Sequence, residues 1–177
     1  MHDVMLKVWG EHVAWMRHYL ISSAANLPDK DDVTVRLMRN QEDIGRAFTP
    51  YYGVAAGEKL TALLKDHVRI AADIIAAAKA GDNARQNEAA ARWNKNADEI
   101  ASFLHALNPK YFPLEEMRTL MRDHLQLTSD VIGARVHCQW ADDVSMHDKV
   151  YRQMLMLADT LSAGIAKQLQ EQTSGPR

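Results

Sequence analysis

The sequence predicts an all-α fold, an up-and-down bundle of about six helices, and two observations support it. Apolar residues recur at intervals of three and four along most of the chain, and no stretch shows the strict alternation that is typical of strands. Helix-breaking residues are sparse, since the 177 residues include 8 glycines and 5 prolines. The hydrophobic share of 47% and the charged share of 25% are typical of a globular protein, so we expect one domain over residues 1–172.

Proline-containing segments bound the first two helices. Leu27-Pro28-Asp29 ends a helix expected over residues 2–25, because proline cannot continue a helix. The aspartate pair at 31–32 is suited to cap the second helix, which we expect to end before Pro50. Tyr51-Tyr52-Gly53 is then expected to be a connector.

Glycine and proline also bound the remaining four helices. The third is expected from about residue 55 to the C-capping Gly81, and the fourth over 83–107, where Asn108-Pro109 stops it. The fifth helix is expected to begin at Pro113, where a proline is followed by two acids in the first turn, and its helical pattern fades near His137. The sixth spans about 141–170, and residues 173–177 are expected to form a disordered tail.

The composition excludes several classes of function. The net charge of −2 leaves no excess of positive charge for phosphate backbones, so nucleic acid is not an expected partner. No run approaches the roughly 18 apolar residues of a membrane span, and no signal-peptide pattern is present, so we expect a cytoplasmic protein without membrane contact. The single cysteine, Cys138, excludes an internal disulfide and cysteine-based zinc or iron–sulfur sites.

An internal repeat places one histidine on each of three helices. The segment 63–75 recurs 57 residues later as 120–132, and both copies contain Asp-His followed by apolar positions. A weaker copy at 11–20 begins with Glu-His-Val. The three histidines are His12, His67 and His124.

The helices that follow the first two copies also resemble each other. Residues 39–45 and 95–101 both contain Asn-x-x-acid-Ile-small, whereas the third copy at 156–162 keeps only Asp159. We therefore predict three helical hairpins that descend from one unit and pack as a bundle.

The repeated residues are predicted to face the core and to form a metal site. Each histidine lies three or four residues from apolar neighbours on both sides, which places it on a buried seam. A buried imidazole or carboxamide without a partner costs roughly 1–3 kcal/mol, so these groups must pair with each other or with a ligand. The predicted set comprises His12, His67 and His124 as nitrogen ligands, Asp43 and Glu99 as carboxylate ligands or their orienting shell, and Asn40 and Asn96 as holders of the imidazole tautomers.

Imidazole and carboxylate ligands suit the divalent transition metals iron, zinc, manganese and copper, and the sequence does not choose among them. We expect the metal between the core helices rather than at a surface pair such as His137 and His147. No nucleophile motif or glycine-rich phosphate loop identifies a substrate, so no reaction is predicted.

Trp9-Gly10-Glu11-His12-Val13 and the two Asp-His-apolar copies resemble motifs of bacterial helical-bundle proteins, ferritin-like or DinB-like in architecture, in which core histidines hold a metal. The resemblance covers the helical plan and these short motifs, and it implies a metal-binding bundle with no assigned reaction. The chain departs from the di-iron ferritin pattern, because none of the three histidines belongs to a Glu-x-x-His pair. A ferroxidase function is therefore not expected.

Two other functions stay open. In a non-enzymatic scaffold or interaction protein, the buried His, Asn and acid groups would serve only to fix the register of the helices. In a small-molecule binding protein, Trp9, Trp15 and Trp93 would border the pocket. A homo-oligomer is compatible with each of these functions.

Overall fold

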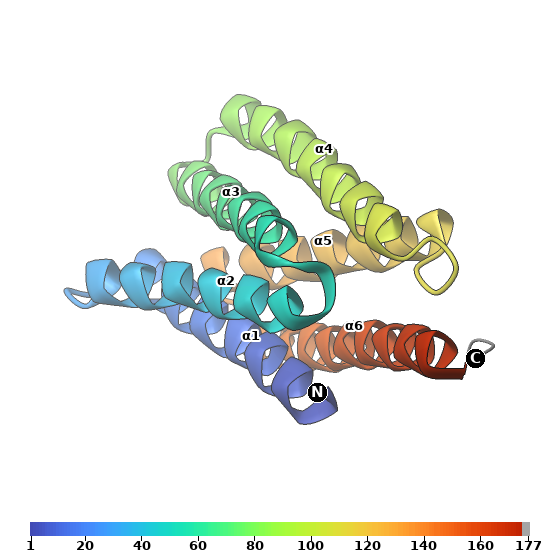
Figure 1. Cartoon of the computed structure of the whole chain (residues 1–177). Helices are drawn as coiled ribbons and strands as arrows, with labels where there is room; N and C mark the ends of the chain where they lie inside the picture. The colour runs from blue at the N-terminus through green and yellow to red at the C-terminus, as the bar shows by residue number, and fades with distance from the viewer. Residues whose placement is uncertain (175–177) are drawn as a thin grey trace.

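The computed structural model describes residues 1–174 and confirms an all-helical fold, with no strand among those residues. Six long helices are joined by short loops (Figure 1). They are α1 (His2–Ala25), α2 (Lys30–Tyr52), α3 (Val54–Ala80), α4 (Asn83–Leu107), α5 (Leu114–Val136) and α6 (Trp140–Ser174). Residues 175–177, which belong to the predicted disordered tail, lie outside the described residues.

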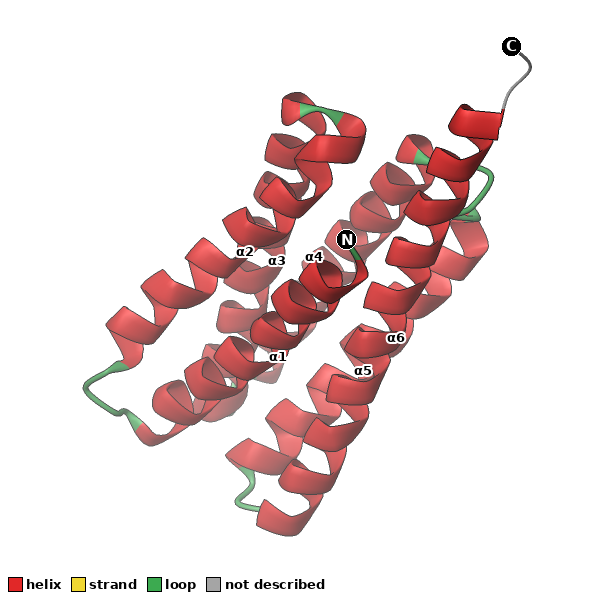
Figure 2. Ribbon diagram, turned by 60° about the horizontal axis from the view of Figure 1, so that its bottom comes forward, coloured by secondary structure: helices red, strands yellow, loops and turns green. Residues whose placement is uncertain are grey.

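The helices form a closed ring. Each helix packs against the one before it and the one after it, and α6 packs against α1. Figure 2 shows the loops at the two ends of the bundle, as expected where consecutive helices run in opposite directions. In addition α1, α3 and α5 contact one another, so these three helices lie nearest the centre of the ring. Inward-facing side chains of these three helices can therefore meet.

Two helix ends differ from the sequence-based prediction. α2 continues through Pro50 to Tyr52, so Gly53 is all that remains of the predicted connector. Pro50 lies in the last turn and removes one bond to the carbonyl four residues earlier, and Gly53 then ends the helix with a φ of 86° that favours glycine. α6 extends to Ser174 and so includes the first two residues of the predicted tail.

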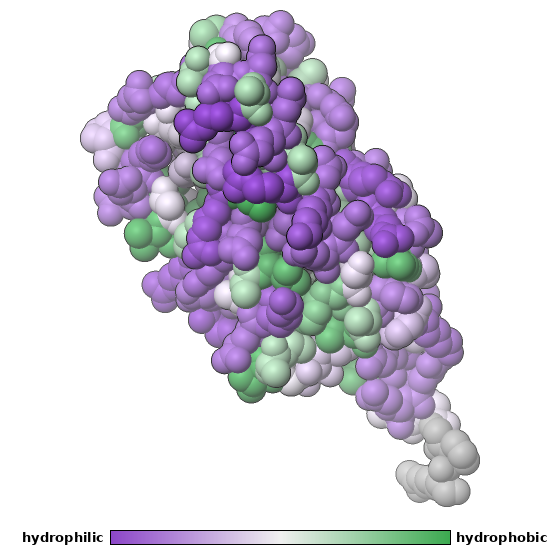
Figure 3. Space-filling model, turned by 90° about the horizontal axis from the view of Figure 1, so that it is seen from above, coloured by the Kyte–Doolittle hydropathy of each residue, from purple (hydrophilic) through white to green (hydrophobic). Residues whose placement is uncertain are grey.

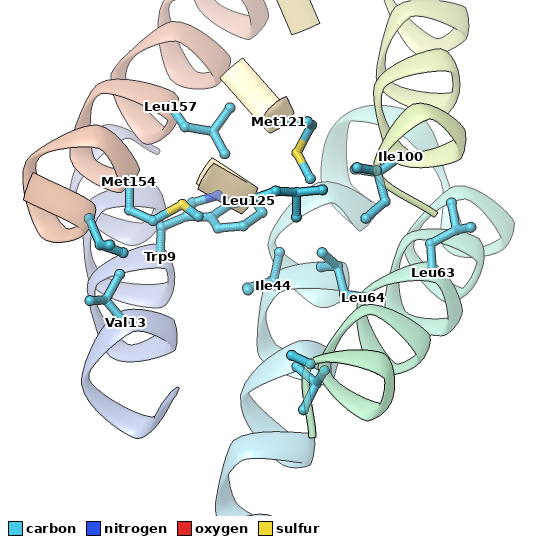
Figure 4. Close-up of a cluster of buried hydrophobic side chains, with 14 of the residues drawn as sticks. Trp9, Val13, Ile44, Leu63, Leu64, Ile100, Met121, Leu125, Met154 and Leu157 are labelled. Atoms are coloured by element: carbon cyan, nitrogen blue, oxygen red, sulfur yellow. The ribbon is translucent and has the colours of Figure 1, made fainter. Parts of the chain in front are cut away.

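Large apolar side chains from all six helices fill the core. In Figure 4, Trp9, Ile44, Leu64, Ile100 and Leu125 project from five different helices into one shared interior. None of these five residues is more than 5% exposed. Since burying such a side chain contributes about 1.5–3 kcal/mol, these contacts hold the ring together independently of any polar group at its centre.

Hydrophilic residues dominate the face shown in Figure 3, and hydrophobic ones gather there in smaller areas. Within residues 1–174, none of the six helices combines the length and the apolar character needed to cross a bilayer.

Gly45 of α2 and Gly57 of α3 allow these two helices to approach closely. A Cβ atom added at Gly45 would lie 2.4 Å from the carbonyl oxygen of Gly57, and one added at Gly57 would lie 2.6 Å from that of Gly45. Backbone atoms cannot give way locally, so a side chain at either position must push the two helices apart.

We expect G57A to lower the free energy of unfolding by about 1–3 kcal/mol, because the added methyl group overpacks the contact between α2 and α3. The matched control is G133A in α5, where an added Cβ meets nothing within 4 Å. Alanine there should raise stability by about 0.5–1 kcal/mol through its better helix propensity. Urea unfolding of both variants measures this, and a G57A protein as stable as wild type would contradict the close approach.

Candidate functional site

The three repeated histidines are buried at the centre of the ring, as their positions in the sequence predicted. His12 lies on α1, His67 on α3 and His124 on α5, and each is 4% exposed. These are the three helices that contact one another across the ring. The fold therefore brings together residues that are 55 and 57 positions apart in the sequence.

The three imidazole rings form one cluster. The ring centroids of His67 and His124 are 5.8 Å apart, with their planes inclined by 29°. Those of His12 and His124 are 6.2 Å apart, with an inclination of 52°. His124 thus neighbours both other rings. We call His12, His67 and His124 the histidine cluster.

Each ring of the cluster has a carboxamide near it from the next helix along the chain. Asn96 Oδ1 accepts a hydrogen bond of 2.8 Å from His67 Nδ1, and Gln41 Nε2 lies 3.3 Å from His12 Nδ1. In both pairs the amide residue follows the histidine by 29 positions. Gln153 follows His124 by the same interval. Burial lowers the pKa of His124 and Gln153 offsets this only in part, and neither His124 Nδ1 nor Gln153 Oε1 has a partner in hydrogen-bonding geometry.

A second contact fixes these amides to the histidine-bearing helices. Asn96 Nδ2 donates to the carbonyl oxygen of Leu63, and Gln153 Nε2 donates to that of Leu120, over 3.1 and 2.9 Å. Both carbonyls belong to the residue four positions before the histidine. Between α1 and α2 the corresponding bond is donated by Asn40 Nδ2 to the carbonyl oxygen of Val8, over 3.0 Å. Asn40 thus makes the backbone contact, whereas Gln41 makes the ring contact with its nitrogen as donor, the reverse of the bond that Asn96 accepts.

One ring of the cluster has a free, buried lone pair. An amide oxygen can only accept, so His67 Nδ1 carries the proton in its bond to Asn96 and His67 Nε2 carries the lone pair. His67 Nε2 is buried and has no hydrogen-bond partner. Leaving such an atom unpaired costs roughly 1–3 kcal/mol, which marks it as a position where a ligand would be stabilising.

Burial keeps the histidine cluster neutral. It lowers the pKa of His12 to about 4, with a further contribution from the charge of His67, and it lowers the pKa of His67 to about 4. The pKa of His124 lies well below its ordinary value because of burial and because of the two other rings. At pH 7 the three rings are neutral bases.

Asp43 and Glu99, predicted as carboxylate ligands, do not join the histidine cluster. Asp43 forms ion pairs with Arg36 and Arg46, and Glu99, whose side chain is 50% exposed, lies 3.9 Å from Lys95. At about 100° per residue Asp43 is rotated by about 200° from Gln41, whereas Glu99 is only about 60° from Asn96, and both carboxylates face basic partners at the surface. Within residues 1–174, no set of three or more His, Cys, Asp or Glu side chains is arranged to hold a metal ion as the side chains stand.

The tryptophans that could border a pocket occupy different positions. Trp9 and Trp93 pack against the rings of His12 and His67, with centroid distances of 6.2 and 5.1 Å. Trp15 is partly exposed and lies under the guanidinium group of Arg36. The two buried tryptophans therefore flank two of the three rings of the histidine cluster.

A small cavity between α1, α5 and α6 adjoins the histidine cluster, and we call it the α1/α5/α6 cavity. Its volume is about 30 Å³, and both His12 and His124 line it. His147 of α6, which the sequence analysis grouped with surface histidines, lines it as well and is partly buried, and burial lowers its pKa. His137 is exposed and bonds to the carbonyl oxygen of Gly133.

A buried ion-pair cluster stands beside this cavity. Asp143 of α6 is fully buried and pairs with Arg17 of α1 and Arg135 of α5. Burial raises the pKa of Asp143, but hydrogen bonds from the two arginines and their charges outweigh it, so the pKa is lowered. Arg17 also lines the α1/α5/α6 cavity. Asp143 thus links the three helices that enclose the cavity.

Sequence reasoning missed Gln41, Gln153, His147 and Asp143. A signal for the two glutamines was present, because a carboxamide follows each repeated histidine by 29 residues. The Asn-x-x-acid pattern predicted Asn40 as the partner of His12 in place of Gln41, and it predicted no amide partner in the third copy. His147 and Asp143 have no counterpart in the repeat, and their placement depends on how α6 packs.

A comparison of the chain with family models, with curated proteins and with solved structures finds no match. The resemblance to ferritin-like and DinB-like bundles therefore stays a prediction, and the geometry of the site carries the functional argument alone.

The pKa shifts predict a loss of stability in acid. The unfolded chain takes up protons near pH 6.5, whereas His12 and His67 in the folded state take them up near pH 4, so stability should fall as the pH drops through this window. At pH 4 each of these two histidines should lower the free energy of unfolding by about 3 kcal/mol relative to pH 7. Urea unfolding in the presence of a chelator at pH 7, 5.5 and 4.5 measures the effect.

H67Q should reduce this pH dependence, because it removes one of the groups that titrate. The matched control is H18Q, since His18 is exposed and bonds only to the backbone of its own helix. A free energy of unfolding that does not change between pH 7 and 4.5 would contradict neutral burial of the cluster.

Proposed function

We propose that this protein binds a divalent transition-metal ion at the histidine cluster. His12, His67 and His124 would be the nitrogen ligands, and the amides of Gln41, Asn96 and Gln153 would orient them. The observation that carries the proposal is the clustering of three neutral, buried imidazoles from three helices, one of which has a buried, unpaired ring nitrogen.

The spacing of the rings supports this function. Three imidazoles that bind one ion at about 2.0–2.1 Å have ring centroids roughly 5–6 Å apart. The observed separations of 5.8 and 6.2 Å are close to that range. Rotation of the side chains would be needed to bring the three nitrogens onto one ion, because they are not arranged around a common point as they stand.

The hydrogen bonds to the amides support the same function. Metal-bound histidines generally donate their second ring N–H to an oxygen, which fixes the tautomer and directs the lone pair to the metal. His67 already has this arrangement through Asn96. Gln153 Oε1 and His124 Nδ1 are both buried without partners, and a rotation of this carboxamide would let its oxygen accept from His124 in the same way. Gln41 differs, because its Nε2 faces His12 and also donates to the Leu37 carbonyl oxygen.

The ligand set narrows the choice of metal. Three imidazoles without a carboxylate or a thiolate suit zinc or copper, and iron next, whereas manganese prefers oxygen ligands. Asp43 and Glu99 are held in surface ion pairs, so the histidine cluster has no carboxylate ligand of the kind that manganese prefers. We take zinc as the first candidate, since it forms stable three-histidine sites that keep one position open.

The repeated helical hairpins belong to this proposal. The three contacts from α2, α4 and α6 to a carbonyl four residues before each histidine favour descent from one hairpin unit. On this view one ancestral His-amide pair was copied three times, and the copies supply the three ligands of one ion. A ferritin-like ancestry is a narrower proposal that the six-membered ring of helices does not require.

Protein purified without an affinity tag and incubated with zinc should carry one ion per chain, measured by elemental analysis after removal of free metal. H67A and H124A should each weaken zinc binding by at least about a hundredfold, because each removes one of three protein ligands. Zinc at 100 times its dissociation constant should stabilise the wild type by about 2.7 kcal/mol. H18A, which alters an exposed histidine, is the matched control and should bind like wild type.

The alternative function is a scaffold in which the histidine cluster only fixes the register of the helices. It predicts wild-type protein without stoichiometric metal, together with H67A and H124A proteins that lose stability by a few kcal/mol through unpaired amides. That combination would exclude the metal-binding function.

A further inference from the structure

The α1/α5/α6 cavity adjoins two of the three ligands of the proposed metal site. His12 and His124 belong both to the histidine cluster and to the wall of this cavity. A cavity needs roughly 10–15 Å³ to hold one water, so the observed volume of about 30 Å³ admits a molecule of two or three atoms. Most of the remaining wall is apolar, including Val13, Val131 and Ile132.

Thr128 supplies a polar group to this wall. It lies on α5 one turn after His124, is 6% exposed, and its hydroxyl is buried without a hydrogen-bond partner. Threonines within helices commonly donate to the carbonyl four residues earlier. Within residues 1–174 five other threonines do so, namely Thr34, Thr49, Thr61, Thr160 and Thr173. Thr128 forgoes this bond, and its hydroxyl is free to donate to a molecule in the cavity.

The charge around the cavity favours an anion. Three neutral imidazoles leave the charge of a divalent ion uncompensated, and Asp43 and Glu99 are held elsewhere. The adjoining cluster of Arg17, Arg135 and Asp143 contains two positive groups and one negative group. A cation buried without a counter-charge is costly, so a small anion beside the metal would be stabilised.

We infer that the α1/α5/α6 cavity binds a small monoanion of two or three atoms as the fourth ligand of the metal, and that the Thr128 hydroxyl donates a hydrogen bond to it. This inference rests on the proposed function, because the anion is held mainly by the metal. It assigns the open face of the site to α1, α5 and α6, and it limits external ligands to those that fit a narrow, largely apolar space.

Azide and cobalt test the inference. Cobalt(II) replaces zinc with little change in geometry, and its visible absorption reports the ligands around it. Azide added to the cobalt-loaded protein should change this absorption and reach saturation. T128V should weaken azide binding by about tenfold or more, because a hydrogen bond to a charged ligand is lost.

T128S keeps the hydroxyl and should restore azide affinity to within a few fold of wild type. T160V is the matched control, since Thr160 bonds to its own helix backbone, and it should leave azide binding unchanged. Equal azide affinity in wild type and T128V would overturn the role of Thr128 and the assignment of the cavity. Cobalt binding without any response to azide would overturn the inference alone, whereas a protein that binds neither cobalt nor zinc would overturn the proposed function with it.

Discussion

The pairing of core histidines with carboxamides on the following helices is the constraint on which the rest of the site depends. Asn96 shows it in full, because one side chain accepts from His67 and donates to the backbone of α3. Its two bonds set the rotation of α4 against α3 and the direction of the imidazole at once. In the first hairpin Asn40 makes the backbone bond and Gln41 makes the contact to the ring, with its amide nitrogen as donor.

Neutral imidazoles at the centre of an apolar core are a compromise between stability and binding capacity. An apolar residue in place of His67 would avoid both the unpaired Nε2 atom and the acid sensitivity that follows from its lowered pKa. The surrounding core can bear this cost, because large side chains such as Ile44 and Ile100 are fully buried on neighbouring helices. A bound ion would convert the unpaired nitrogen into a stabilising contact.

Much of the fold followed from the sequence, whereas only part of the site did. The apolar periodicity predicted the six helices and the burial of His12, His67 and His124, because both depend on which face of a helix is apolar. The partner of His12 was assigned to Asn40 instead of Gln41, since one residue changes direction on a helix by about 100°. Asp43 and Glu99 were chosen for their sequence proximity, but competition from Arg46 and Lys95 at the surface is visible only in three dimensions.

X-ray absorption spectroscopy at the zinc edge tests the central claim most directly, because it counts the ligands of the ion and identifies imidazole by its multiple scattering. The account predicts three imidazole nitrogens at about 2.0–2.1 Å and one further light-atom ligand in the zinc-loaded protein. A first shell made only of oxygen, or one with fewer than three imidazoles, would show that the ion binds away from His12, His67 and His124 and would contradict the account.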